Sequence, residues 1–120
     1  MMGLLGRPAV AALAMSLALA PTASADNEDY FLNELYKTHQ KWYWSYGEQY
    51  IVDVGHGVCN DWAAGVSYPD EVASLAMSKQ WSQRNTRYFI ALATGSFCQG
   101  YYSTKIPPEA RLQPGQLPGS

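Results

Sequence analysis

The feature that most constrains this chain is its N-terminal segment, which has the three parts of a secretory signal peptide. Arg7 supplies a positive charge, residues 8–20 are apolar except for one serine, and Ala23–Ala25 is a small-x-small cleavage site. The alternative is a core helix or a membrane anchor, but a helix of about 13 residues covers only about 20 Å of a hydrocarbon core about 30 Å thick. We therefore expect residues 1–25 to be removed on export, leaving no membrane span.

Export decides how the two cysteines of the sequence, Cys59 and Cys98, should be interpreted. Outside the cytoplasm unpaired thiols tend to oxidise, so we expect these two to form one disulfide. The enclosed loop is about 39 residues long, and the chain-entropy model assigns such a loop about 4 kcal/mol of stabilisation. The alternative is two buried free thiols. A catalytic cysteine is less favoured, because pairing would consume it.

Apolar residues recur at helical spacing in four segments after the signal peptide, and no segment shows the sustained alternation of a strand. The first stripe contains Leu32, Leu35, Tyr36 and His39, and the last contains Phe89, Leu92, Ala93, Ser96 and Phe97. The expected helices cover about residues 27–38, 46–64 and 69–80, with a fourth that delivers Cys98 at its end.

Capping residues mark the expected ends of these helices. Ser45–Glu48 has the S-x-x-E form of a capping box. Ser67 is a second expected cap, because it is followed by a proline and an aspartate, which favour the first turn of a helix. Gly65 and Gly100 are the expected stops of the second and fourth helices.

Two glycines inside the second expected helix, Gly55 and Gly57, each cost about 1 kcal/mol relative to alanine. We expect close approach of another helix to offset that cost. A kink is the rival explanation.

The composition changes after Tyr102, where prolines and glycines replace large apolar residues. Such a segment has little to bury, so residues 103–120 are expected to be a disordered tail. The sequence therefore predicts an all-α domain over residues 26–102, a small bundle of about four helices clamped by one disulfide. A domain this small usually needs such a covalent link.

The residues around these features resemble the small secreted actinobacterial, chiefly mycobacterial, family catalogued as domain of unknown function 732. The resemblance covers about residues 26–98, and its most specific part is the two cysteines with their flanks. The matching motifs are Phe31-Leu32-x-x-Leu35, Gly55-His56-x-Val58-Cys59, Gly65-x-Ser67, Phe89-x-x-x-Ala93 and Phe97-Cys98. The resemblance implies a mycobacterial or related source, or a phage of such a host, export through the envelope, and a helical fold with one disulfide. It implies no established activity.

Five aromatic residues lie within nine positions of the sequence: Trp42, Tyr43, Trp44, Tyr46 and Tyr50. Such a group can stack on sugar rings, hold a porphyrin or acyl chain, or anchor a protein partner. The alternative is that these residues fill the core of a domain poor in aliphatic residues. Adjacent side chains cannot all face one way, so we expect at least one to be partly exposed.

His56 is the second candidate contact residue, since a helix places it one turn from Asp53 and near Tyr50. A Tyr and His pair would suit haem iron, and an Asp and His pair would suit acid-base chemistry. The alternative is a packed or capping polar residue beside the disulfide, because a lone histidine is weak evidence for a site.

Charge and motifs exclude several functions. Eight Lys and Arg against ten Asp and Glu, with no basic cluster, argue against nucleic-acid binding. The Cys and His positions do not suit a structural zinc site, and Asp61, Asp70 and Glu71 lack the dense oxygen ligands of a calcium loop. No phosphate loop or hydrolase motif is present, so no metal, cofactor or catalytic residue is predicted.

We therefore expect a secreted, non-enzymatic module that binds an unidentified protein or envelope component in or beyond the cell envelope. The alternative is a carrier of a small hydrophobic or haem-like ligand. The third hypothesis is an envelope hydrolase. It would need a serine or carboxylate within hydrogen-bond reach of His56 in a cleft.

Overall fold

The computed structural model describes residues 27–37 and 44–112, and every regular element in this part of the chain is a helix. The predicted signal peptide and residues 113–120 lie outside it. After a first helix at residues 27–37, the elements are η1 (Trp44–Tyr46), α2 (Glu48–Ala63), α3 (Tyr68–Lys79), α4 (Gln83–Phe97), η2 (Gln99–Tyr101), α5 (Tyr102–Lys105) and η3 (Pro108–Ala110), where η denotes a 3-10 helix. The all-α prediction is confirmed.

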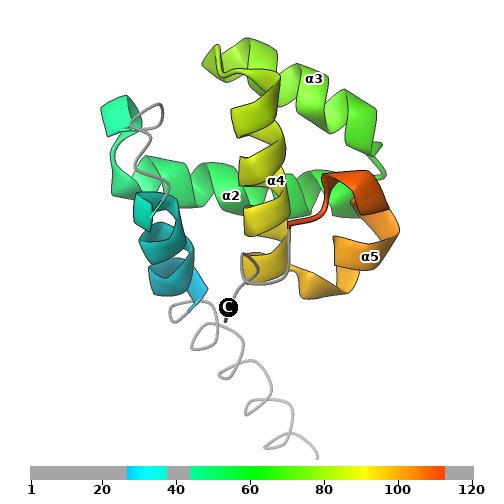
Figure 1. Cartoon of the computed structure of the whole chain (residues 1–120), viewed down its shortest axis with the longest axis horizontal. Helices are drawn as coiled ribbons and strands as arrows, with labels where there is room; N and C mark the ends of the chain where they lie inside the picture. The colour runs from blue at the N-terminus through cyan, green and yellow to red at the C-terminus, as the bar shows by residue number, and fades with distance from the viewer. Residues whose placement is uncertain (1–26, 38–43, 113–120) are drawn as a thin grey trace, which may run out of the picture.

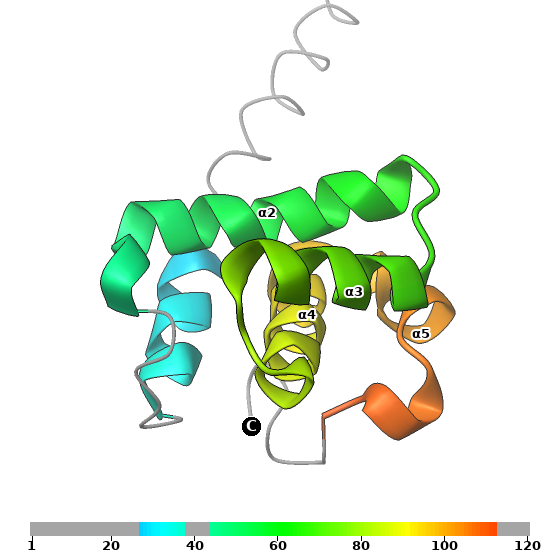
Figure 2. The ribbon, with the colours of Figure 1, turned by 90° about the horizontal axis from the view of Figure 1, so that it is seen from above.

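Helix α4 lies at the centre of the domain, with α2 and α3 packed against it (Figures 1 and 2). Its residues from Phe89 to Ser96 are all buried, whereas the sequence predicted a single apolar stripe. The difference arises because η2, α5 and η3 also contact α4. Trp62 of α2 donates its indole N–H to Thr94 Oγ1 at 2.9 Å, and Thr94 in turn donates to the Ile90 carbonyl at 2.7 Å. A buried polar link therefore joins α2 to α4.

The first helix contributes Phe31 and Leu35, both fully buried, to the same core. Their spacing of four residues places them on one face of the helix. The buried face differs from the predicted apolar stripe. Tyr36, which was part of that stripe, is 39% exposed, and His39 lies outside the described residues. Figure 1 shows this helix beside the beginning of α2.

The ends of α3 and α4 follow the predicted capping rules. The Ser67 hydroxyl accepts from the Asp70 amide at 3.3 Å, and the Ser82 hydroxyl accepts from the Asn85 amide at 3.1 Å. Gly65 follows the end of α2 with a φ of 91°, a conformation that favours glycine.

Two predicted helix ends were wrong. Gly47, with a φ of 82°, caps α2 without a side-chain hydrogen bond, so Ser45 and Glu48 do not form the expected capping box. A positive φ is strained for residues other than glycine, which explains why α2 begins after this position. Helix α4 ends at Phe97, and Gly100 lies within η2. The backbone leaves the helical region at Cys98, two residues before Gly100, so Gly100 does not end the helix.

The close approach expected at Gly55 is confirmed. A Cβ atom at this position would lie 2.8 Å from Phe97 Cε2 and 3.2 Å from Phe31 Cζ, so rings from α4 and the first helix occupy that space. At Gly57 a Cβ would meet nothing within 4 Å. Only one of the two glycines is therefore explained by packing.

The predicted disulfide joins Cys59 of α2 to Cys98 at the end of α4, with the two Cα atoms 6.0 Å apart. It links the two helices on which most of the core is built.

The folded region continues past Tyr102, where the sequence placed the start of the tail. Ile106 is only 1% exposed, and Arg111 donates from Nε to the Ile106 carbonyl at 2.9 Å. The amide of Leu112 donates to the Tyr102 hydroxyl at 2.9 Å. One buried isoleucine and these bonds hold residues 103–112 against α4, and a composition rich in proline does not reveal such isolated anchors.

Candidate functional site

The predicted aromatic segment is only partly described by the structure. Trp42 and Tyr43 lie outside the described residues, and the side chain of Trp44, the first residue of η1, does as well. Tyr46 at the end of η1 and Tyr50 in the first turn of α2 are described, and they lie together.

Tyr46, Tyr50 and Lys79 form a cluster that we call the aromatic–lysine patch. The two tyrosine rings stack with centroids 5.3 Å apart and an interplanar angle of 17°. The Lys79 ammonium donates to the Tyr50 hydroxyl and lies 4.6 Å from the Tyr50 ring centroid and 5.7 Å from that of Tyr46. Tyr50 is 43% exposed, so the patch faces solvent. A residue of α3 thus completes a site that the sequence placed on one segment only.

The core holds this patch in place from behind. The Tyr46 hydroxyl donates to the Lys79 carbonyl at 3.1 Å, and the Tyr46 ring meets Trp81 edge to face, with centroids 6.1 Å apart. Trp81 is buried and packs against Phe89 of α4 at a centroid distance of 5.0 Å. The exposed Tyr50 ring therefore rests on a tyrosine that is anchored by two independent contacts.

Among the described residues, Lys79, like Lys105 over the Trp62 ring, has aromatic rather than carboxylate neighbours, which distinguishes it from Lys37 and His56. Lys37 pairs with Glu34 at 2.7 Å, and His56 pairs with Glu28 at 2.9 Å. Within residues 27–37 and 44–112, no carboxylate pairs with Lys79. Its ammonium is instead held against two aromatic rings, an arrangement favoured by cation–π attraction.

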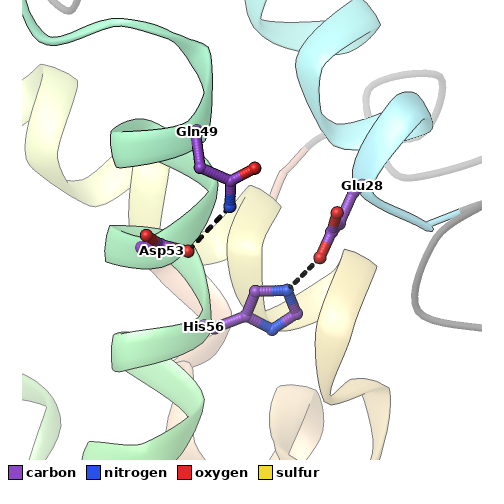
Figure 3. A network of polar contacts seen from close by, with 4 residues as sticks. All are labelled: Glu28, Gln49, Asp53 and His56. Atoms are coloured by element: carbon purple, nitrogen blue, oxygen red, sulfur yellow. Dashed lines mark hydrogen bonds and ion pairs between the residues drawn. The ribbon is translucent and has the colours of Figure 1, made fainter. Parts of the chain in front are cut away.

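His56 has different neighbours from those the sequence suggested. Its Nε2 lies 2.9 Å from a Glu28 carboxylate oxygen of the first helix, and its ring stacks on Phe97 with centroids 4.0 Å apart. Asp53 instead accepts a hydrogen bond from the Gln49 amide at 2.9 Å. Figure 3 shows the two pairs separately, with His56 directed toward Glu28 across the gap between helices. The Asp53–His56 pair is therefore not formed.

These contacts bear on the two alternative chemistries. Tyr50 bonds to Lys79 and His56 to Glu28, so the two side chains proposed as haem ligands are engaged separately. Glu28 does supply a carboxylate within hydrogen-bond reach of His56, which is one part of what a hydrolase would need. Phe97, however, covers one face of the imidazole, and no serine or cysteine nucleophile is bonded to it in the described part of the chain. The pair serves to fasten the first helix to α2.

A pair of carboxyl groups was missed by the sequence reasoning. Glu71 of α3 is only 3% exposed, and its carboxyl forms a side-chain hydrogen bond with Asp61 of α2. Burial, followed by the hydrogen bond and the charge of Asp61, raises the pKa of Glu71 to about 8. Asp61 itself is only half-buried, whereas Glu71 is inside the domain. The sequence presents these acidic residues only as possible calcium ligands, because the turn between α2 and α3 is what brings them near each other.

No metal site or membrane span is found in the described ranges. No group of three or more His, Cys, Asp or Glu side chains there could hold a metal ion. None of the helices between residues 27 and 112 is long and apolar enough to cross a bilayer.

The fold and its bridge define a class: small all-α domains stabilised by one disulfide between two core helices. Within that class, residues 25–100 match the model of a family described as protein of unknown function (DUF732). The match covers more than half of the chain, and the protein belongs to this family. No curated protein and no solved structure matches the chain. The match confirms that the chain is a member of domain of unknown function 732, the family that the motifs around the cysteines resemble.

Proposed function

We propose that this protein is an exported, non-enzymatic module that binds a component of the cell envelope, or a protein partner there, through the aromatic–lysine patch. The observation that carries the proposal is Tyr50, a large aromatic residue held 43% exposed on a stacked, core-anchored support. An isolated exposed aromatic needs no functional explanation, but Tyr50 is fixed beside an ammonium that no carboxylate among the described residues pairs with, and this combination is typical of a contact site.

The chemistry of the patch suits recognition. Tyrosine offers apolar area and a hydroxyl at a small cost in conformational entropy, and Tyr50 has already lost part of that entropy by stacking on Tyr46. Lys79 adds a positive charge that attracts an anionic group on a partner. A partner that offers a ring or acyl surface next to an anionic group would satisfy both.

The export part of the proposal is supported by the disulfide, which is compatible with an oxidising, extracytoplasmic compartment. Intact mass spectrometry of the protein recovered from the culture medium of a mycobacterial expression host tests it. We expect a chain that begins at Asp26 and lacks the two hydrogens of free Cys59 and Cys98. A cell-associated chain that retains residues 1–25 would contradict export.

The non-enzymatic part is supported by the contacts of His56, which is occupied by Glu28 and Phe97. General acid–base catalysis needs a substrate proton or a nucleophile next to the imidazole. The same atoms have a sufficient structural role in joining the first helix to α2.

Co-sedimentation with a purified mycobacterial cell-envelope fraction tests the contact surface. We expect Tyr50→Ala to weaken binding about tenfold, as for a central aromatic contact. Met77→Ala is the matched control, because Met77 is 80% exposed on α3 and does not belong to the aromatic–lysine patch. Its binding should stay within about twofold of the unaltered chain. Equal losses in the two variants, or none in either, would refute the assignment of the patch.

A further inference from the structure

The chain leaves α3 through a backbone conformation that favours glycine but is occupied by glutamine. The described residues with a positive φ are Gly47, Gly65 and Gln80. Gln80 has a φ of 60° and a ψ of 37°, which is the left-handed helical region. The amides of Gln80 and Trp81 both donate to the Ala76 carbonyl and so close the end of α3. Glycine is the usual residue at such a helix end, because a side chain in this conformation is sterically strained.

The turn at Gln80 brings the residues on both sides of it to the same tyrosine ring. The Lys79 carbonyl accepts from the Tyr46 hydroxyl at 3.1 Å, and the Lys79 ammonium lies 5.7 Å from the Tyr46 ring centroid. The Trp81 ring meets the Tyr46 ring edge to face, with centroids 6.1 Å apart. Residues two apart in a continuous helix do not face each other, so the left-handed residue between them is what lets both contact Tyr46. Figure 2 shows α3 running back beside α2, which places this turn toward the beginning of α2.

The backbone of this turn does not need the side chain of Gln80. A glycine at position 80 would form the same turn without the steric strain. The Gln80 side chain is exposed, and its carboxamide forms no hydrogen bond with any residue that the structure describes. It carries two N–H donors and a carbonyl acceptor, all open to an external group. Strained backbone conformations are concentrated at functional sites, and this one directly follows Lys79 of the aromatic–lysine patch.

We propose that Gln80 is a further contact residue, which binds the partner of the aromatic–lysine patch through its carboxamide. This inference rests on the proposed function and adds a second polar requirement to it. The partner presents a hydroxyl or amide group, which both donates and accepts, next to the anionic group that Lys79 attracts. The strained turn then has two roles: it fixes Lys79 and Trp81 on Tyr46, and it presents the carboxamide beside them.

Two variants of the disulfide-bonded chain, Gln80→Gly and Gln80→Ala, separate the side chain from the backbone. Binding is measured by co-sedimentation with the purified mycobacterial cell-envelope fraction, and stability by thermal unfolding. Both variants lose the carboxamide, so we expect both to bind about three- to tenfold more weakly, as for the loss of one hydrogen bond. Gln80→Gly also relieves the strain and should raise Tm by about 4–8 °C, whereas Gln80→Ala keeps a Cβ atom and should leave Tm nearly unchanged. A variant that is more stable and yet binds more weakly is the expected signature of a contact residue.

Gln99→Ala is the matched control, because Gln99 is an exposed glutamine beyond the opposite end of α4. Its binding should stay within about twofold of the unaltered chain. Unchanged binding in both Gln80 variants would overturn the inference, and so would a loss in Gln80→Gly alone, which would assign the effect to the backbone of the turn. Tyr50→Ala in the same assay distinguishes the two proposals. If it weakens binding while the Gln80 variants do not, only the role of Gln80 is wrong, whereas no loss in Tyr50→Ala refutes the patch itself.

Discussion

Gly55 gives the sharpest test of the packing described here. In Gly55→Ala, the new methyl group would lie 2.8 Å from Phe97 Cε2 and 3.2 Å from Phe31 Cζ. Phe31 is fully buried and contacts both Phe89 and Phe97, at centroid distances of 5.3 and 4.9 Å, so its ring cannot retreat without disturbing the core. Phe97 can move only by giving up its stack on His56.

The size of the effect follows from two opposing terms. Overpacking by one methyl group costs about 1–3 kcal/mol, and replacing glycine by alanine in a helix returns about 1 kcal/mol. We expect a net loss of up to about 2 kcal/mol, or up to about 16 °C in Tm for a domain of this size. Gly57→Ala gains the same helix propensity without meeting any atom within 4 Å, so it should raise Tm by about 4–8 °C.

Thermal unfolding followed by far-ultraviolet circular dichroism measures both variants under identical oxidising conditions. The two substitutions are chemically identical and lie two residues apart in α2, so their difference isolates the approach of the two rings. If Gly55→Ala melts as high as Gly57→Ala, the close packing of the first helix on α2 and α4 is wrong.

Three further predictions concern stability. The folded protein holds a proton on Glu71 that the unfolded chain releases above its ordinary pKa of about 4.5, so stability should fall between pH 5 and pH 8, by at most about 1.4 kcal/mol per pH unit, and then level off. Glu71→Gln should flatten this slope in urea titrations, and an unchanged slope would exclude Glu71 as its source. Replacing Cys59 and Cys98 by serine should cost about 4 kcal/mol in the same titrations, whereas a loss below about 1 kcal/mol would show that the bridge is not a main support. Ile106→Ala should lower the free energy of unfolding by about 2–4 kcal/mol. An unchanged stability would mean that residues 103–112 do not belong to the folded domain.

The parts of the fold that depend on local pattern could be predicted from the sequence. Ser67 starts α3 because its hydroxyl accepts a hydrogen bond from a first-turn amide that has no carbonyl partner within the helix. The disulfide could be predicted because thiols of an exported chain tend to oxidise and the sequence contains two cysteines. Ser45 failed as a cap because Gly47 adopts a positive φ, a backbone conformation that the S-x-x-E spacing does not encode.

The candidate site was predictable only in part. Tyr46 and Tyr50 are close in the sequence, but they lie in different elements on either side of Gly47, so helical spacing does not predict their stacking. Lys79, Glu28 and the Asp61–Glu71 pair reach their partners through tertiary packing between different helices, which no local period records. The sequence could offer only nearby partners for His56, Asp53 and Tyr50, whereas the residue that it contacts is the distant Glu28.

The most direct test of the proposed contact site is an amide chemical-shift map of the disulfide-bonded chain during titration with detergent-solubilised mycobacterial envelope material. The account predicts shifts concentrated at residues 46–50 and around Lys79, with α4 unaffected. Shifts centred on His56 and Phe97, or a spectrum that does not change at saturating envelope concentration, would contradict it.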